Sequence, residues 1–218
     1  MKRHQQAFVF LLSSSILMGL SGCVPLLFGG AAVTTATVAT DRRSTGAIVN
    51  DEVLEKRVYL EVTQGIKTQD YHLTVTSYDG KVLLTGEVAS VAIKEKAGML
   101  ARNSLDVSSV VNELAVRPVT TATERLSDSY LATKVRTQIV GTKQISLNQM
   151  KVTVDRGIVY LMGIVTPDEA ARTKKLVANI DGVKEVVALF NVETVEMVKQ
   201  RMKTLNQQPH SNEERFDK

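Results

Sequence analysis

The stretch YDGKVLLTG, residues 78–86, decides the fold of this chain. Its Asp-Gly pair is a strong signal for a tight hairpin turn, because glycine accepts a positive φ angle without steric cost. Apolar and polar residues alternate on both sides of the turn, as they do in half-buried strands. The chain later reads DRGIVYLMG, residues 155–163, with both glycines at the same spacing. The same strand–turn–strand unit therefore occurs twice.

The repeat extends well beyond the hairpin. An offset of 77 residues superposes the apolar positions of a preceding helical pattern, the strands and the glycines. The superposed pairs include Leu54 with Leu131, Val58 with Val135, Val62 with Ile139, Val75 with Val152, Gly80 with Gly157 and Gly86 with Gly163. Two copies of about 65–70 residues are too few for a solenoid. We therefore expect two domains, at residues 47–118 and 119–194.

Each copy shows the same order of helical and strand patterns. Apolar residues recur every four positions from Leu54 onward, which predicts a first helix with one buried stripe. A second helix follows the hairpin, and in the second copy Thr166 is its predicted N-cap. A last strand, 110–116 or 186–192, closes the unit through a right-handed crossover. The sequence predicts an α+β protein with two tandem αββαβ domains, each a small three-stranded mixed sheet packed by two helices.

The N-terminus has the features of an export signal, at residues 1–22. Lys2 and Arg3 precede an apolar stretch that is too short to span a bilayer. The stretch ends in LSGC, residues 20–23, which resembles a bacterial lipobox. This resemblance implies cleavage before Cys23 and attachment of acyl chains, of the palmitate class, to its thiol and new amino group. Cys23 is the only cysteine in the chain, which excludes a disulfide framework and a thiolate metal cluster.

The residue after the cysteine indicates the compartment. In lipoproteins of Gram-negative bacteria, Asp at this position resembles an inner-membrane retention signal, so Val24 implies the outer membrane, with the chain facing the periplasm. Removal of the signal lowers the formal net charge from +4 to +2, and an exported protein does not meet DNA, so we expect no nucleic-acid partner. We further expect residues 23–46 to be an acylated Cys and flexible tether, and residues 195–218 to be a polar, disordered tail that begins as a fraying helix.

The hairpin pattern G-x-V-x-L-x-G and the last-strand pattern V-x-x-V-x-N-x-L together resemble the BON domain. With the lipobox and the segment DRRSTG at 41–46, the whole mature chain is similar to the dual-BON outer-membrane lipoproteins. The resemblance implies phospholipid binding and a role in envelope integrity and at the division site, without catalysis. Ala188 departs from the pattern, since the first copy has Asn112 at the matching position.

No catalytic, metal or cofactor motif is evident in the sequence. The three histidines, His4, His72 and His210, show no ligand spacing, and His4 leaves with the signal. Nucleophile elbows, P-loops and HExxH motifs are absent. The glycines of the hairpins lie at strand ends rather than before a helix, so we interpret them as turn residues and not as a phosphate loop.

The first helices of the two copies differ in charge. Residues 51–66 carry four acidic against two basic residues, a net charge of −2, whereas residues 128–143 carry one acidic against three basic residues, a net charge of +2. If Leu131, Val135 and Ile139 face the core, the opposite face is nearly uncharged and begins with an aromatic residue. We therefore predict that phospholipid binds to Tyr130, Thr133, Lys134, Arg136, Thr137 and Val140.

Two alternatives remain open at this stage. Tyr130 could pack against the other domain, or it could be an ordinary surface residue near the start of the helix. By resemblance to the family, an aromatic residue, commonly Trp, occupies this position. The acidic first domain suits packing against its twin or a protein partner. The rival function is therefore an adaptor that recruits or regulates an enzyme of cell-wall or outer-membrane assembly.

Overall fold

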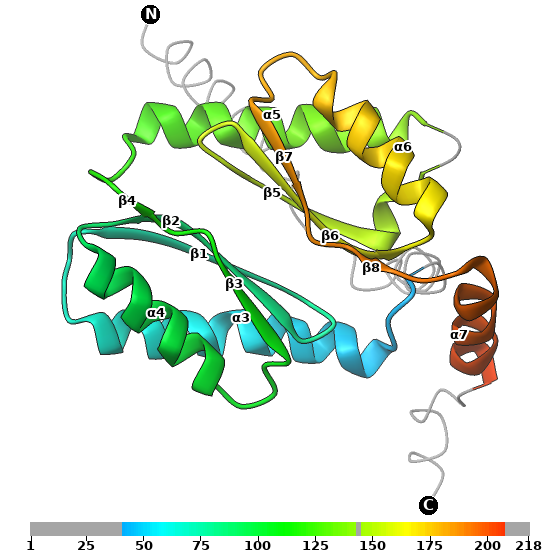
Figure 1. Cartoon of the computed structure of the whole chain (residues 1–218), viewed down its shortest axis with the longest axis horizontal. Coiled ribbons are helices and arrows are strands. Elements are labelled where there is room, and N and C mark those ends of the chain that lie inside the picture. Colours follow the sequence, from blue (N-terminus) through cyan, green and yellow to red (C-terminus); the bar gives the residue numbers. More distant parts are fainter. Residues whose placement is uncertain (1–40, 143–144, 208–218) are drawn as a thin grey trace, which may run out of the picture. The chain divides into compact units, whose positions relative to one another are not determined.

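Each copy of the repeat folds into a small sheet covered on one face by two helices (Figure 1). The computed structural model describes residues 41–142 and 145–207, which belong to one compact unit. The first copy contains α3 Thr45–Ile66, β1 Tyr71–Tyr78, β2 Lys81–Val88, α4 Val91–Asn103, β3 Ser109–Asn112 and β4 Ala115–Val116. The second contains α5 Ala122–Val140, a 3-10 turn at Leu147–Gln149, β5 Met150–Asp155, β6 Ile158–Val165, α6 Pro167–Ala178, β7 Glu185–Ala188 and β8 Asn191–Val192. The predicted α+β fold is confirmed.

The two sheets share one topology. The hairpin strands β1 and β2 pair antiparallel, and β5 pairs with β6 in the same way. The strand after the second helix pairs in parallel with the second strand of the hairpin, which is the middle strand of the sheet. Thus β3 pairs with β2, and β7 pairs with β6. Each last strand is interrupted, so that β4 and β8 continue it as short separate segments. The helix between parallel strands supplies the long connection that such pairing requires.

Both hairpin turns have the backbone that the sequence predicts. Asp79 and Gly80 have φ angles of 53° and 76°, and Arg156 and Gly157 have φ angles of 54° and 77°. Positive φ at both central residues is the signature of a type I′ turn, which matches the right-handed twist of the strands. The turn assignment is therefore confirmed in both copies.

An aspartate on the first helix holds each turn. The Asp51 carboxylate accepts hydrogen bonds from the two backbone N–H groups of the first turn, at 2.8 and 3.0 Å. Asp128, which lies 77 residues later, accepts the equivalent bonds from the second turn, at 2.7 and 2.8 Å. The sequence analysis counted these residues only as surface charges. Their shared offset was the signal for a structural role.

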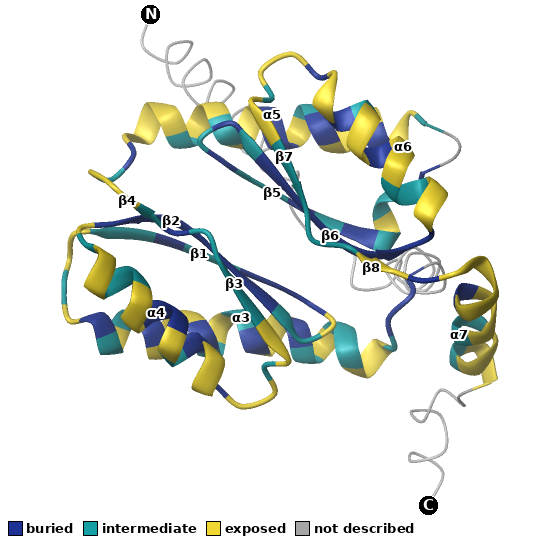
Figure 2. Cartoon of the chain, in the orientation of Figure 1, coloured by how far each residue is buried: buried dark blue, intermediate teal, exposed yellow. Residues whose placement is uncertain are grey.

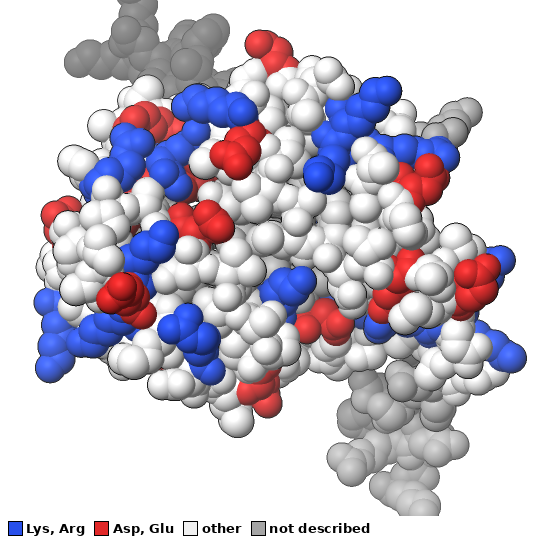
Figure 3. All heavy atoms as spheres, viewed as in Figure 1, with Lys and Arg blue, Asp and Glu red and all other residues white. Residues whose placement is uncertain are grey.

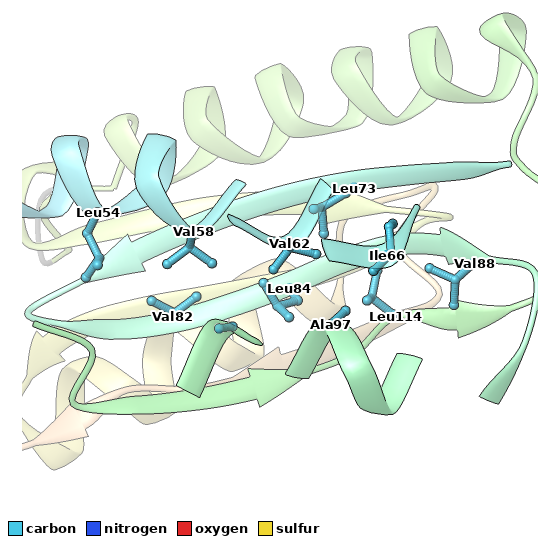
Figure 4. Packing of buried hydrophobic residues seen from close by; sticks show 11 residues of the cluster. Leu54, Val58, Val62, Ile66, Leu73, Val82, Leu84, Val88, Ala97 and Leu114 are labelled. Atoms are coloured by element: carbon cyan, nitrogen blue, oxygen red, sulfur yellow. The ribbon is translucent and has the colours of Figure 1, made fainter. Parts of the chain in front are cut away.

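Each domain has its own core between the helices and one face of the sheet. Leu54, Val58 and Val62 point from α3 toward Val82 and Leu84 of β2 (Figure 4). The second domain repeats this arrangement with the buried face of α5. The core residues on that face are Leu131, Val135 and Ile139. The predicted inward faces of both first helices are confirmed.

The other faces of the two sheets pack against each other. Leu83 of β2 forms a buried cluster with Tyr160, Met162 and Ile164 of β6. Burial therefore runs along the whole length of both middle strands, as Figure 2 shows. This differs from the expected half-buried strands, because each sheet covers the face of the other sheet that the helices leave open. The mutual packing expected for two small domains is present.

The prediction that the flexible tether extends through residue 46 is wrong for its last residues, which are ordered. Arg42 is buried and donates to both carboxylate oxygens of Glu169, at 2.7 and 2.8 Å. Arg43 is also buried and donates to Asp51 at 2.8 Å. These ion pairs order the segment, and no local sequence pattern reveals the distant Glu169. The export signal, Cys23 and the rest of the tether lie outside the described residues.

Residues 195–207 of the predicted tail are helical, as expected, but they are packed rather than fraying. They form helix α7, Val195–Gln207, in which Val198 is buried (Figure 1). Arg201 forms an ion pair with the buried Glu193. The buried side chains therefore supply a packing face that the polar composition concealed. Residues 208–218 lie outside the described part of the chain.

Candidate lipid-facing site

The start of α5 is held by a capping box. The Glu124 N–H donates to the Thr121 side chain, and the Glu124 carboxylate accepts the Thr121 N–H at 2.7 Å. These hydrogen bonds from Thr121 lower the pKa of Glu124 below its ordinary value. The box satisfies N–H groups that a helix start leaves free and so fixes the first turns of the helix.

The outward face of α5 is an exposed apolar stripe. Leu126, Tyr130 and Val140 are 71%, 72% and 67% exposed, and the exposed Thr133 and Thr137 lie between them. We call these five residues the α5 stripe. The exposure of Tyr130 excludes packing against the first domain, which was one of the open alternatives. Leu126 was missed by the sequence analysis, although it lies four residues before Tyr130 and so on the same helix face.

The two predicted cations beside the stripe are held by other parts of the second domain. The Lys134 Nζ donates to the Asp181 carbonyl at 2.8 Å and lies 3.5 Å from the Asp181 carboxylate. The Arg136 guanidinium donates to the Val152 carbonyl at 2.6 Å. The structure thus places both residues at the border of the stripe. Their hydrogen bonds tie α5 to a loop and to β5, so neither side chain is fully available to a ligand.

A hollow of about 340 Å³ lies beside Tyr130. Its lining includes four basic side chains, from Arg117, Lys134, Arg156 and Lys184, and three acidic ones, from Glu124, Asp128 and Asp181. Within residues 41–142 and 145–207, the Arg117 guanidinium has no hydrogen bond or close ion pair, although its charge helps to lower the pKa of Glu124. Lys184 Nζ makes one hydrogen bond, to the Arg156 carbonyl at 3.1 Å. Arg117 and Lys184 are therefore the cations best able to receive an anion here, and the sequence analysis did not single them out.

The first helix carries a similar stripe. Val49, Val53 and Leu60 are exposed on α3. The repeat offset pairs Val49 with Leu126 and Val53 with Tyr130, so the outward apolar face is present in both copies. The two stripes differ in the size of their apolar residues, and only the α5 stripe has a large aromatic ring at its centre.

Several acidic side chains of α3 are paired with other groups of the same chain. Lys151 of the second domain lies 3.1 Å from Glu52 and 2.8 Å from Glu55. Asp51 is turned inward to the hairpin turn. Of the alternatives for the acidic helix, packing against its twin is therefore present. In Figure 3, basic and acidic side chains are mixed on the visible face, without a large patch of one sign.

Comparison with known proteins agrees with this architecture. The model of the BON domain family matches residues 50–118 and 127–194. The chain is 35% identical over 181 residues to Outer membrane lipoprotein DolP of Haemophilus influenzae, which covers 81% of this chain and 93% of that protein. It is 28% identical over 156 residues to the 21 kDa hemolysin of Actinobacillus pleuropneumoniae, with coverage of 71% and 80%.

The solved structures provide only a weak likeness. CdsD, a structural protein of the type III secretion system of Chlamydia trachomatis, matches over 70% of this chain and 97% of that chain, with 12% identity and a TM-score of 0.29. This similarity is too low to carry an argument.

The resemblance stated from the sequence is confirmed. The family model covers most of both copies of the repeat, and the 35% identity supports an outer-membrane lipoprotein of the dual-BON type. None of the helices within the described residues is long and apolar enough to cross a membrane. The chain belongs to the BON domain family and carries two BON domains in tandem.

Proposed function

We propose that this lipoprotein faces the periplasm and binds anionic phospholipid, of the phosphatidylglycerol class, through the α5 stripe. In this proposal the chain is a binding protein without catalytic activity. It supports the integrity of the cell envelope, including at the division site. The observation that carries the proposal is the exposed stripe that includes Tyr130, next to a hollow lined by Arg117 and Lys184.

The stripe has the chemistry of a membrane–water boundary. A tyrosine ring can be buried among lipid chains while its hydroxyl stays in water, and Leu126 adds apolar area on the same face. Arg117 and Lys184 lie in the hollow beside it, where they can meet a lipid phosphate. Lys134 and Arg136 add positive potential, although their hydrogen bonds keep them in place.

The expected affinity is small without the membrane anchor. Each basic residue near an anionic surface contributes about 1 kcal/mol, so four of them and a partly buried ring give roughly 5 kcal/mol. That free energy corresponds to a dissociation constant of about a millimolar or somewhat less. Acylation at Cys23 would supply an effective concentration of roughly millimolar order, which makes such a weak contact significant. The anchor would hold the chain on the membrane, and the stripe would select the lipid.

Vesicle flotation tests the proposal. A soluble form, residues 24–218, should float in part with vesicles that contain phosphatidylglycerol when the lipid is at roughly millimolar concentration, near the expected dissociation constant, and not with vesicles of phosphatidylcholine alone. Tyr130→Glu should abolish flotation without unfolding, because the side chain is exposed. Val53→Glu is the matched control, since it makes the same change at the equivalent position of α3, and it should float normally. Equal loss in both variants, or none in either, would contradict the proposal.

Charge variants refine the test. Arg117→Gln should weaken flotation more than Arg136→Gln, because Arg117 has no hydrogen bond or close ion pair in the described chain and Arg136 is hydrogen-bonded to Val152. Binding by the wild type should also decrease as salt screens the exposed charges. Equal effects of the two variants would show that the hollow does not receive the phosphate.

The adaptor function remains the second candidate, and one observation favours it. The exposed α3 stripe of Val49, Val53 and Leu60 is a surface on which a protein partner could bury apolar area. If Val53→Glu, rather than Tyr130→Glu, reproduces the envelope defect of a strain that lacks the protein, the adaptor explains the function better.

A further inference from the structure

Three side chains of metal-ligand type meet where the two BON domains face each other. His72 lies on β1, Glu87 on β2 and Asp155 at the end of β5, and one ligand atom from each lies within 4.8 Å of the others. The hairpin register places His72 directly opposite Glu87. The turn of the second domain then brings Asp155 to them. Sequence spacing could not reveal this group, because its members come from three strands.

The two carboxylates of the group are buried, His72 is half-buried, and some of their polar atoms lack a hydrogen bond. Glu87 and Asp155 are 0% and 4% exposed. Among the described residues, four buried side-chain polar atoms have no hydrogen-bond partner, and two of them are His72 Nδ1 and Glu87 Oε1. A third, Thr85 Oγ1, lies two residues from Glu87 and so on the same face of β2. Buried polar atoms are normally paired, so their concentration at one place points to a ligand between them.

The donor set suits zinc, and so does the spacing between its His72 and Glu87 ligand atoms. His72 Nδ1 lies 3.3 Å from Glu87 Oε2. Two ligands bound about 2.0–2.1 Å from a tetrahedral zinc ion are separated by about 3.3 Å. One imidazole nitrogen and two carboxylate oxygens make three protein ligands, which leaves the fourth position for water.

The charge balance leaves room for a cation. Arg156 Nε lies 2.9 Å from Asp155 Oδ2 and 3.4 Å from Glu87 Oε1, and it offsets one of the two negative charges. One negative charge remains when His72 is neutral. Arg156 contacts one oxygen of Asp155, so in the proposed site the other oxygen of that carboxylate would bind the metal ion.

Thr120 already orients one of the proposed ligands. Glu87 Oε2 accepts hydrogen bonds from the Thr120 N–H at 3.2 Å and the Thr120 hydroxyl at 2.9 Å. Such partners fix the direction of a ligating carboxylate. Thr120 lies in the segment that joins the two domains, so the same group of residues connects both domains and their linker.

We propose that His72, Glu87 and Asp155 form a Zn²⁺ site that links the two BON domains. Two ligands belong to the first domain and one to the second, so the ion binds tightly only when the domains are docked. Zinc would therefore stabilise the docked pair by mass action. This inference does not depend on lipid binding by α5.

The test uses the mature lipoprotein in detergent, stripped of metal. We expect calorimetry to detect one Zn²⁺ per chain and the melting temperature to rise with zinc concentration. His72→Gln should remove both effects. The matched control is His210→Gln, because His210 is the other histidine that remains after the export signal is removed. That variant should bind zinc as the wild type does.

A readout on the unmutated chain keeps the proposal testable if a variant folds poorly. In nuclear magnetic resonance spectra of the wild type, Zn²⁺ should shift the imidazole signals of His72 and leave those of His210 in place. Asp155→Asn, on the other domain, should weaken binding. Absence of binding by the wild type, unchanged binding by His72→Gln, or shifts confined to His210 would each overturn the proposal.

Discussion

The hydroxyl oxygens of Thr76 and Thr153 lie 3.0 Å apart and share a hydrogen bond. The two residues are separated by 77 positions, which is the offset of the repeat, so they are the same residue of the two BON domains. Equivalent residues meet each other only near a two-fold axis, as in an isologous dimer. The paired equivalents Leu83 and Tyr160 lie in the same interface cluster. The two domains are therefore packed as a pseudo-symmetric dimer within one chain.

The Thr76–Thr153 hydrogen bond gives the first prediction. Thr76→Val should destabilise the chain by about 1 kcal/mol, because it leaves a half-buried hydroxyl of Thr153 without its partner. Thr153→Val should cost a similar amount. The double variant should cost less than the sum of the two, since it removes both hydroxyls together. Chemical denaturation of the four proteins measures this coupling, and strict additivity would show that the hydroxyls do not interact.

The hairpin turns give the second prediction. Gly80→Val and Gly157→Val should each destabilise the chain by about 1–3 kcal/mol, because the backbone holds φ at 76° and 77°. Gly46→Ala is the control, since Gly46 lies in α3 and its added Cβ would meet only Ser44 Oγ at 3.8 Å. That change should be neutral or stabilising by up to about 1 kcal/mol. Equal losses at all three positions, measured by thermal unfolding, would contradict the turn assignment.

Asp51 gives a prediction for pH. Burial alone would raise the pKa of Asp51, but hydrogen bonds from Gly80, Ser77 and Asp79, and from Arg43, lower it below its ordinary value. The lowered pKa means that Asp51 stabilises the folded state above its unfolded pKa of about 3.9. This contribution is lost as the pH falls through the folded pKa.

The matching variant is Asp51→Asn. It should destabilise the chain by about 3 kcal/mol at neutral pH, because a buried ion pair with Arg43 is broken. The difference from the wild type should narrow as the pH falls below about 4. Asp128→Asn should cost less, since no cation among residues 41–142 and 145–207 forms an ion pair with Asp128. Urea denaturation across this pH range checks the sign, and a gap that widens in acid would contradict it.

Arg42 gives the fourth prediction. Its guanidinium donates to the buried Ile164 carbonyl at 2.9 Å and to the half-buried Glu169 carboxylate. Arg42→Ala removes both of these bonds, although Glu169 keeps the hydrogen bond from the Thr166 N–H. The loss should be about 2 kcal/mol or more, because hydrogen bonds to charged groups contribute about 1.5–3 kcal/mol. Lys151→Ala, which breaks a more exposed ion pair, should cost under about 1 kcal/mol. Thermal unfolding distinguishes the two, and equal shifts would mean that Arg42 is not a structural link.

Local patterns were enough to predict the domain fold. The four-residue recurrence of Leu54, Val58 and Val62 fixed which face of α3 is buried, and Asp79-Gly80 specified the turn. The contacts between the two domains, in contrast, correspond to no local pattern in the sequence. Glu87 stands in an alternating strand where its charge suggests exposure, yet the second sheet buries it.

Only those features of the candidate site that depend on a local pattern could be predicted from the sequence. The helical period of α5 was enough to place Tyr130 and Val140 outward. It could not show that Lys134 and Arg136 are hydrogen-bonded to Asp181 and Val152, because those partners lie on other elements. Nor could it show that Arg117 lines a hollow beside Tyr130, since that proximity depends on how the connecting segments fold.

The most direct test of lipid binding maps the site on the unmutated chain. Chemical-shift changes should be measured for residues 24–218, without the acylated cysteine, as phosphatidylglycerol micelles are added. The account predicts that the largest changes cluster at Leu126, Tyr130 and Val140, with Arg117 and Lys184 affected next to them. Changes centred on Val49, Val53 and Leu60 of α3, or spread evenly over both domains, would contradict it.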